Sequence, residues 1–441
     1  MIKTISTQTK GLHGTLFIPG DKSISHRALL FGAAAQGTTE IKGLLEGEDV
    51  LCTAEALRKL GARIEKNTNG LWFVTGTETF KKPDSILDMG NSGTGVRLLM
   101  GLLSSYPIQA RLTGDSSLCS RPMKRITDPL TQTGAVFETT EGKLPIVMTG
   151  SEQDKPFEYT LPVASAQIKS AVLLSGLRRK SPTVVHEPIP CRDHTERMLK
   201  AFGADIAVEK DALGGNVITL HGGKRLTACP VVVPADISSA AFAIVAALIT
   251  PDSEIVLPNI GINPLRTGIL DVLLEMGADI SFENKREIAG EPVADLRVRS
   301  SALKSVNVPA GKAPSMIDEY PILAVATAFA DGKTRLNGLT ELKVKESNRL
   351  QAIVDGLTRN GIEAEALPDD SIRIRGKGNN ACGGGTIEAK LDHRIAMSFM
   401  VMGMASESPV VIDDVSSVAT SFPDFISLMN NAGANIYDYR D

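Results

Sequence analysis

The sequence contains few cysteine and aromatic residues. Aromatics make up 4% of its 441 residues, and its five cysteines are scattered along the chain: Cys52, Cys119, Cys191, Cys229 and Cys382. Their number is odd and none forms a C-x-x-C pair, which argues against a disulfide framework or a structural zinc site. No pair of His or Cys residues has the spacing of metal ligands. We therefore expect neither a metal nor another cofactor.

Long hydrophobic runs and a strong excess of one charge are also absent. The longest apolar run, Ala240 to Ile249, is about half of the ~20 residues that span a bilayer. Met1 to Lys10 lacks the apolar core of a signal peptide. A net charge of −4 gives the molecule as a whole no attraction for nucleic acid or anionic membranes. These absences predict a cytoplasmic protein in which any anion site is a local cluster of Lys and Arg.

The chain does have a globular composition and a repeated pattern. Its content of 42% apolar and 22% charged residues is typical of a globular protein, and its length suffices for two or three domains. One sequence pattern recurs, in which an amphipathic helical segment is followed by a glycine and then by a strand. The glycines are 73, 69, 74, 84 and 72 residues apart: Gly61, Gly134, Gly203, Gly277, Gly361 and Gly433. We predict that each ends a helix in the left-handed conformation.

A second sequence pattern alternates with the first. It begins with small or polar residues, called here the opening of the helix, and continues as a helix that is apolar on every side. Its six openings lie near Ser23, Ser92, Ser165, Ser238, Ile317 and Asp392. Such a helix is predicted to be buried all round, whereas the amphipathic helix covers an outer face. Each of the six units therefore reads as roughly β-α-β-α-β-β, which indicates an α/β fold.

Six buried helices cannot share one core in a chain of this length. Two clusters of three, each enclosed by sheets and outer helices, would satisfy the pattern, although the periodicity alone does not require this inside-out arrangement. We expect the chain to cross between two lobes near Pro19–Gly20 and Pro230–Ala235. This division gives one lobe residues 21–234, and the other residues 1–20 together with 235–441.

The openings of the predicted buried helices carry cations. The first places Lys22, Ser23 and Arg27 at a helix N-terminus, where free backbone N–H groups and the helix dipole attract anions. An ordinary capped helix with solvated charges explains these residues equally well. The second, Gly90 to Arg97, has three glycines that would let a ligand approach the backbone, with a tight turn as the alternative. It matches neither G-x-G-x-x-G nor a Walker A loop.

A carboxylate stands near the fifth predicted buried helix. Asp318 is out of place in an anion pocket unless it moves protons or binds a substrate hydroxyl, and the alternative is an N-cap that favours the helix dipole. Lys345 and Arg349 are four residues apart, on one face if that segment is helical, with Glu346 between them. We expect His194, ahead of an outer helix, to be a local cap partner.

The cations share one kind of position. Seven lie at or beside helix openings: Lys22, Arg27, Arg121, Arg192, Lys345, Arg349 and Arg394. If the lobes face each other, these openings would converge on one cleft. Each cation in contact with a phosphate is worth about 4 kcal/mol at an effective dielectric of 20, before desolvation. The set therefore suits two anionic ligands side by side.

Eight segments that contain these residues resemble the motifs of one enzyme family. They are GDKSISHRAL, GNSGTGVRLLMG, SRPMKRITDPL, ASAQIKSAVLLSGL, CRDHTERML, KVKESNRL, DHRIAMSF and ATSFPDF. Between residues 20 and 424 and in this order, they are similar to those of 5-enolpyruvylshikimate-3-phosphate (EPSP) synthases, in the bacterial class II form. The resemblance implies a monomeric, two-lobed inside-out α/β barrel with three repeats in each lobe.

The resemblance also implies a reaction and a set of site residues. The enzyme would transfer the enolpyruvyl group of phosphoenolpyruvate to the 5-hydroxyl of shikimate 3-phosphate through a tetrahedral intermediate. Protons would be handled by Asp318, Glu346 and Lys22. Shikimate 3-phosphate, bound mainly by the lobe of residues 21–234, would be held by Lys22, Ser23, Arg27, Ser165, Ala166, Gln167, Asp318 and Lys345. Phosphoenolpyruvate would be held by Lys22, Gly93, Arg121, Gln167, Arg349 and Arg394.

One departure and two alternatives accompany the resemblance. Class I members carry a Lys in A-K-T-F-P-D, and this chain lacks that cation in the corresponding segment, Ala419 to Asp424. The family is a glyphosate target, but Gly93 and Leu98 have opposite implications for sensitivity. A UDP-N-acetylglucosamine enolpyruvyl transferase is the alternative enzyme, although Cys119 lacks the glycine-rich loop expected there. A non-catalytic anion-binding module is the other alternative, against which Asp318 and Glu346 argue.

Overall fold

The computed structural model describes residues 2–378 and 382–440, and the chain divides into two compact units. Unit 1 comprises the described residues of Met1–Pro19, Pro234–Glu287 and Pro292–Asp441, and unit 2 comprises Gly20–Val233 and Ile288–Glu291. The chain therefore passes between the units at Pro19–Gly20 and at Val233–Pro234. It also passes between them on either side of Ile288–Glu291, a short segment that no sequence pattern assigned to unit 2.

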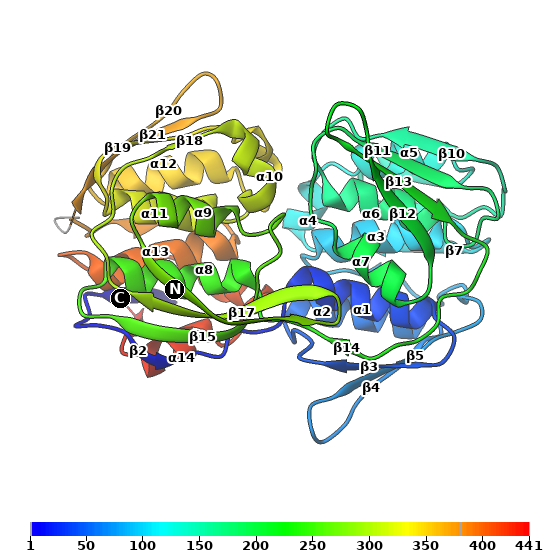
Figure 1. The fold of residues 1–441 in the computed structure, drawn as a ribbon, viewed down its shortest axis with the longest axis horizontal. Coiled ribbons are helices and arrows are strands. Elements are labelled where there is room, and N and C mark those ends of the chain that lie inside the picture. The colour runs from blue at the N-terminus through cyan, green and yellow to red at the C-terminus, as the bar shows by residue number, and fades with distance from the viewer. Residues whose placement is uncertain (1, 379–381, 441) are drawn as a thin grey trace. The chain divides into compact units, whose positions relative to one another are not determined.

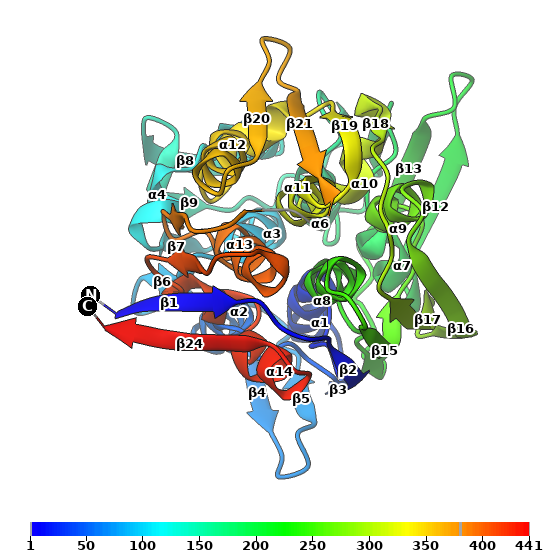
Figure 2. The same cartoon turned by 90° about the vertical axis from the view of Figure 1, so that its left-hand side faces the viewer.

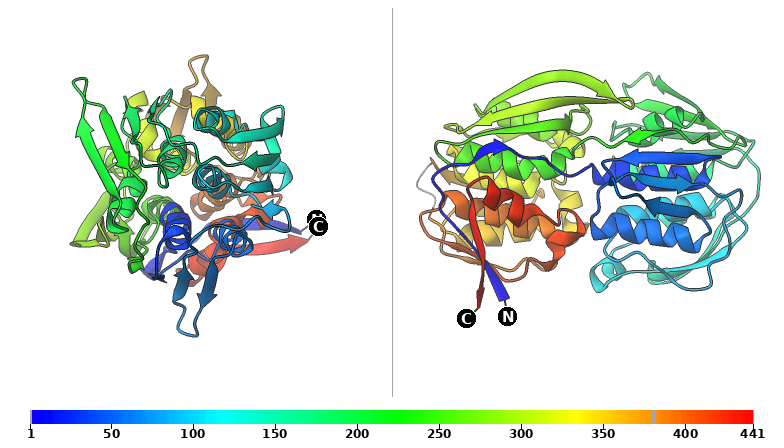
Figure 3. Two further views of the ribbon diagram at one scale, coloured as in Figure 1. Left: turned by 90° about the vertical axis from the view of Figure 1, so that its right-hand side faces the viewer. Right: turned by 90° about the horizontal axis from the view of Figure 1, so that it is seen from below.

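Three buried helices lie in the middle of unit 2 (Figure 3, left): α1 (Lys22–Ala34), α3 (Gly93–Leu103) and α6 (Ala166–Ser175). Helices α3 and α6 approach closely because Gly101 has no side chain, and a Cβ there would lie 2.5 Å from the Cα of Ala171. The outer helices are only half-buried, as amphipathic helices should be. They are α2 (Glu48–Lys59), α5 (Lys124–Thr131) and α7 (His194–Ala201), with the short α4 (Ser116–Ser120).

Three four-stranded sheets lie around these helices in the described part of unit 2. The first is β14 (Val231–Val232), β3 (Thr38–Lys42), β5 (Trp72–Thr75) and β4 (Arg63–Lys66). The second is β6 (Leu87–Asp88), β7 (Gln109–Thr113), β9 (Lys143–Thr149) and β8 (Val136–Thr140). The third is β10 (Phe157–Thr160), β11 (Thr183–Glu187), β13 (Asn216–His221) and β12 (Asp205–Lys210). Alternate residues of β3 are buried, so one face of this sheet packs on the helices.

Unit 1 repeats this plan (Figures 1 and 2). Its central helices are α8 (Ile237–Ile249), α11 (Tyr320–Ala328) and α13 (His393–Ala405). The other α-helices are α9 (Gly268–Glu275), α10 (Ala313–Met316), α12 (Arg349–Arg359) and α14 (Phe425–Asn431). Short 3-10 helices are η1 (Ala310–Lys312), η2 (Thr340–Val344) and η4 (Ser416–Thr420).

The described part of unit 1 also has three four-stranded sheets. The first is β16 (Asp279–Ile288), β17 (Glu291–Arg299), β15 (Glu254–Gly261) and β2 (His13–Thr15). The second is β18 (Asn307–Val308), β19 (Asp331–Leu336), β21 (Ile372–Lys377) and β20 (Glu363–Ala366). The third is β22 (Thr386–Ile387), β23 (Val410–Ile412), β1 (Ile2–Thr7) and β24 (Asn435–Arg440).

The sheets share a pattern of strand pairing. In each, one edge strand runs parallel to its neighbour. The remaining pairs are antiparallel in five sheets, and in the sixth β15 is antiparallel to β17. The two chain ends meet in unit 1, where Lys3 of β1 lies opposite Tyr439 of β24 (Figure 3, right). No helix in the described part of the chain has the length and apolar character that crossing a membrane requires.

The predicted repeat is confirmed at the helix ends. All six repeat glycines have positive φ, between 78° and 117°. Five of the buried helices begin within one residue of the predicted opening. The exception is α11, which begins at Tyr320, so Asp318 lies in the turn between α10 and α11 rather than on the helix. The N-cap position of α11 is occupied by Glu319, not by Asp318.

Candidate active site

The opening of α1 in unit 2 holds a lysine beside a carboxylate. Asp21 caps the helix by accepting a hydrogen bond from the backbone N of Ile24 at 2.8 Å. Lys22 is the first helical residue, and its Nζ lies 3.1 Å from Oδ2 of Asp49 on α2. Both side chains are mostly buried, so the ammonium group is held at the helix N-terminus rather than free in solvent.

Arg27, one turn further along α1, is buried among neutral oxygens. Its Nε donates to Thr195 Oγ1, its Nη2 to Ser170 Oγ and its Nη1 to the carbonyl oxygen of Ser23, each at 2.8 Å. Burial lowers the pKa of Arg27 to about 10, and Asp21 and Glu196 oppose the shift. The guanidinium therefore keeps its positive charge at neutral pH, and the three neutral oxygens hold it without cancelling that charge.

The opening of α3 brings two arginines together over Gly93. A Cβ on Gly93 would lie 3.0 Å from Nη1 of Arg121 and 3.2 Å from Nη1 of Arg97. Arg97 also donates to Oε1 of Gln167 at 2.7 Å. Gly93, Arg121 and Gln167 were predicted site residues, whereas Arg97 was not among them. Its position four residues after Gly93, one turn into the same helix, is the signal that could have found it.

The opening of α6 carries the remaining predicted residues of unit 2. Ser165 caps the helix by accepting a hydrogen bond from the backbone N of Ile168 at 3.4 Å, and Ala166 is the first helical residue. Gln167 also donates through Nε2 to Thr94 Oγ1 at 3.0 Å, which ties this opening to that of α3. Arg192 is half-buried, two residues before α7.

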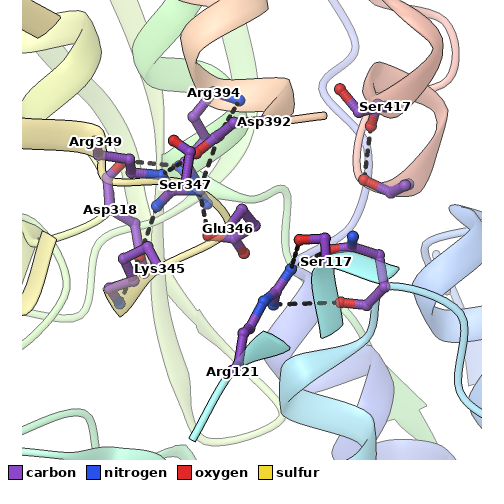
Figure 4. Close-up of polar contacts among 12 residues, drawn as sticks. Ser117, Arg121, Asp318, Lys345, Glu346, Ser347, Arg349, Asp392, Arg394 and Ser417 are labelled. Atoms are coloured by element: carbon purple, nitrogen blue, oxygen red, sulfur yellow. Dashed lines mark hydrogen bonds and ion pairs between the residues drawn. The ribbon is translucent and has the colours of Figure 1, made fainter. Parts of the chain in front are cut away.

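Unit 1 contains a second cluster, centred on the buried Arg349 (Figure 4). Its Nε lies 2.8 Å from Oδ2 of Asp392, and its Nη2 lies 2.6 Å from Oε2 of Glu346. Asp318 Oδ1 lies 3.5 Å from Nη1 of Arg349 and 3.0 Å from Nζ of Lys345. Burial by itself would lower the pKa of Arg349, but Asp392 and Glu346 outweigh it and raise that pKa above its usual value.

Arg394 completes this cluster from the first turn of α13. Its Nη1 donates to the carbonyl oxygen of Asp318 at 3.1 Å and lies 3.6 Å from Oε1 of the buried Glu319. Glu319 also accepts hydrogen bonds from Ser238 and Arg266. The predicted site residues of unit 1 are therefore brought together: Asp318, Lys345, Glu346, Arg349 and Arg394.

Two local expectations differ from the structure. Lys345 follows the 3-10 helix η2 in an extended conformation and Arg349 begins α12, so they do not share a helix face, although both reach Asp318. The prediction that His194 is a local cap partner is wrong. Its Nδ1 lies 2.8 Å from Oε1 of Glu291, 97 residues away, and this buried contact helps to hold the segment Ile288–Glu291 in unit 2.

Cys119 lies just before Arg121 and is half-buried. Its Sγ donates to the carbonyl oxygen of Gly114 at 3.3 Å. A half-buried thiol with this contact differs from the reactive cysteine in a glycine-rich loop that the alternative enzyme would have.

Comparison with known proteins gives matches over the whole length of the chain. The family profile of EPSP synthase (3-phosphoshikimate 1-carboxyvinyltransferase) matches residues 6–429. The chain belongs to the EPSP synthase family. A relative from Paramagnetospirillum magneticum, named 3-phosphoshikimate 1-carboxyvinyltransferase, is 55% identical over 99% of this chain and 98% of its own. Another of that name, from Parvibaculum lavamentivorans, is 54% identical over 96% and 94% of the two chains.

Solved structures agree with this family assignment. EPSP synthase from Acinetobacter baumannii matches with a TM-score of 0.87, 46% identity and full coverage of both chains. The enolpyruvyl transferase NikO from Streptomyces tendae, at 17% identity and a TM-score of 0.78 over 99% of both chains, shares the fold alone. The predicted family, its inside-out α/β fold and its carboxyvinyl transfer are thereby confirmed, and the UDP-N-acetylglucosamine enzyme is not favoured.

Proposed function

We propose that this chain transfers the enolpyruvyl group of phosphoenolpyruvate to the 5-hydroxyl of shikimate 3-phosphate and releases phosphate. The observation that carries the proposal is the cluster around Asp318, in which one carboxylate lies within 3.5 Å of both Lys345 and Arg349. A carboxylate held against two cations suits a site that must bind anionic substrates and also accept a proton. The names of the full-length relatives support the same reaction.

Shikimate 3-phosphate would bind to residues of both units. Lys22, Ser23 and Arg27 would meet its charged groups at the N-terminus of α1, where the helix dipole adds to their charge. Ser165, Ala166 and Gln167 would donate hydrogen bonds from the opening of α6. Asp318 and Lys345 would bind its hydroxyl groups, with the carboxylate accepting and the ammonium donating.

Phosphoenolpyruvate would bind to the residues of each unit that the family resemblance assigns to it. In unit 2 it would contact Lys22, Gly93, Arg121 and Gln167. In unit 1 it would contact Arg349 and Arg394, whose charges would face its phosphate and carboxylate. The guanidinium groups are already fixed by buried carboxylates in unit 1, so little reorganisation would accompany binding of the substrate.

The reaction would proceed by addition and then elimination. Asp318 would take the proton of the 5-hydroxyl as its oxygen attacks C2 of phosphoenolpyruvate. Lys22 or Glu346 would deliver a proton to C3, which gives a tetrahedral intermediate. Loss of a C3 proton and of phosphate would then restore the double bond. These steps need no covalent enzyme intermediate.

A cytoplasmic, monomeric enzyme is the further expectation from the family, and we propose it on that basis. Light scattering of the purified protein, with and without both substrates, tests the monomer directly. A mass of about twice the 46.9 kDa chain would contradict it.

The decisive experiment measures phosphate release from phosphoenolpyruvate with two acceptors. We expect turnover with shikimate 3-phosphate, and none with UDP-N-acetylglucosamine at the same concentration. Phosphate release only with the nucleotide sugar would favour the UDP-N-acetylglucosamine enolpyruvyl transferase. Release with neither acceptor would favour a non-catalytic anion-binding module. Adding glyphosate to the same assay measures the sensitivity that Gly93 and Leu98 leave open.

A further inference from the structure

A buried histidine for which the proposed reaction has no role lies between two of the helix openings. His26 is on α1, four residues after Lys22, and its side chain is 0% exposed. Its Nδ1 lies 2.9 Å from Oγ1 of Thr53 on α2. Its Nε2 lies 3.3 Å from Oγ of Ser92, the N-cap residue of α3 that immediately precedes Gly93.

We assign the direction of both hydrogen bonds from the neighbours of the ring. Thr53 donates its hydroxyl proton to the carbonyl oxygen of Asp49 at 3.3 Å, so it accepts from an Nδ1–H of His26. Nε2 then carries no proton and accepts from the hydroxyl of Ser92. Ser92 Oγ in turn accepts from the backbone N of Gly95 at 3.0 Å. A neutral imidazole with its proton on Nδ1 satisfies each of these partners.

The opening of α3 is shaped to fit this set of hydroxyls. A Cβ on Gly95 would overlap Oγ1 of Thr53 and would lie 2.7 Å from Oγ of Ser92. The absence of a side chain at position 95 therefore lets the first turn of α3 pack directly on the partners of His26. The same network reaches Lys22, because Asp49 accepts from Thr53 through its carbonyl and pairs with Lys22 through its carboxylate.

We propose that His26 is a positioning residue that fixes the Gly93 opening of α3 against α1. Through Ser92 it holds the backbone at Gly93, on which Arg97 and Arg121 converge. This inference rests on the proposed function, since Gly93 and Arg121 are there assigned to phosphoenolpyruvate. Loss of the imidazole would loosen that subsite and leave Ser23, Arg27 and Ser165, assigned to the other substrate, in place.

The test compares His26→Leu with His26→Gln in steady-state assays of the full chain. Leu fills the space without hydrogen bonds, whereas Gln keeps one donor and one acceptor. We expect His26→Leu to raise KM for phosphoenolpyruvate about tenfold, with KM for shikimate 3-phosphate and kcat changed less than about threefold. His26→Gln should recover most of the loss. An unchanged KM for phosphoenolpyruvate, equal increases in both KM values, or a Gln variant as poor as Leu would overturn the proposal.

Two milder variants keep the test decisive if His26→Leu does not fold. Ser92→Ala and Thr53→Val each remove one hydroxyl from the network, and each should raise KM for phosphoenolpyruvate selectively, by about threefold or more. Thr38→Val is the matched control. The side chain of Thr38 forms an exposed hydrogen bond with that of Thr75 and lies outside the network around His26. Normal kinetics in both Ser92→Ala and Thr53→Val would refute the role of His26.

The failure of this inference is distinguishable from failure of the proposed function. If the wild-type chain releases no phosphate with both substrates, the proposed function fails. If the wild type releases phosphate with both substrates and the variants have the same KM values as the wild type, only the role of His26 fails. An independent readout is the nitrogen NMR spectrum of histidine-labelled protein, in which the His26 signal should report Nδ1–H. A proton on Nε2 would overturn the hydrogen-bond assignment from which the proposal is argued.

Discussion

Arg349 and Asp392 form a two-point ion pair that is wholly buried in unit 1. Nε of the arginine lies 2.8 Å from Oδ2 of the aspartate, and Nη2 lies 3.1 Å from Oδ1. The side chains of both residues are 0% exposed. Charges so placed are stable only together, because each would otherwise lose its hydration without a replacement. Asp392 therefore fixes the orientation of an arginine that we assign to phosphoenolpyruvate.

Replacement of this aspartate should lower the stability of the protein. Asp392→Asn leaves Arg349 with Glu346 and Asp318 as charged neighbours, so we expect a loss of about 2–3 kcal/mol in the free energy of unfolding, the lower end for a broken buried pair. Urea unfolding followed by circular dichroism measures it. Glu365→Gln is the control, since its pair with Arg373 is exposed and its loss should not be measurable. An equal effect of both substitutions would contradict the prediction.

Substitution of the proposed base should act on turnover. Asp318→Asn keeps the size of the side chain but cannot accept the hydroxyl proton, so kcat should fall at least ~100-fold, the usual contribution of a general base. Asp271→Asn is a matched control, because Asp271 also pairs with a lysine, Lys312, but on an exposed surface. Near-normal kcat in Asp318→Asn, measured by phosphate release, would end the assignment of the base.

The sequence predicted the elements that depend on local periodicity. The repeat glycines, the buried helices and the cations at their openings follow from short-range patterns, and the structure contains them. Two features were missed because they depend on partners far along the chain. His194 is bonded to Glu291 across 97 residues, and Asp392 acts through Arg349, 43 residues away. No spacing rule links such pairs, since only the folded chain brings them together.

The close packing of α3 on α6 allows a prediction about Gly101→Ala. Two opposing effects decide whether this substitution raises or lowers the free energy of unfolding. Gly101→Ala would gain about 1 kcal/mol in helix propensity. The new Cβ, however, would lie 2.5 Å from both Cα and the carbonyl oxygen of Ala171, and this backbone cannot move without displacing α6. Overpacking of this kind costs about 1–3 kcal/mol or more.

Net destabilisation by Gly101→Ala is therefore expected, of up to about 2 kcal/mol in urea unfolding, because the gain in helix propensity offsets only part of the overpacking cost. Gly311→Ala is its control, because a Cβ at Gly311 meets no atom within 4 Å and its φ is not positive. A stabilised Gly101→Ala variant would show that the two helices are further apart than this 2.5 Å approach.

The charge state of His26 predicts a dependence of stability on pH. Burial, helped by Lys22 and Arg27 and opposed by Asp21, lowers the pKa of His26 from 6.5 to about 3. Below pH 6.5 the unfolded chain binds a proton at this residue and the folded chain does not. The contribution of His26 to stability is thus complete above the unfolded pKa and is lost as the pH falls toward 3.

Between pH 7 and pH 5, the wild type should lose about 2 kcal/mol more in the free energy of unfolding than His26→Gln, which has no proton to bind. The only tryptophan, Trp72, lies in β5 of unit 2, and β5 contacts α1, the helix that carries His26. Its fluorescence in urea therefore follows the unfolding of unit 2. His221→Gln, which replaces an exposed histidine in the same unit, should retain the wild-type slope. Parallel pH profiles for the wild type and His26→Gln would mean that the buried imidazole is protonated in the folded state. Such a ring could not accept the hydrogen bond from Ser92, so the measurement also tests the network that joins α1 to α3.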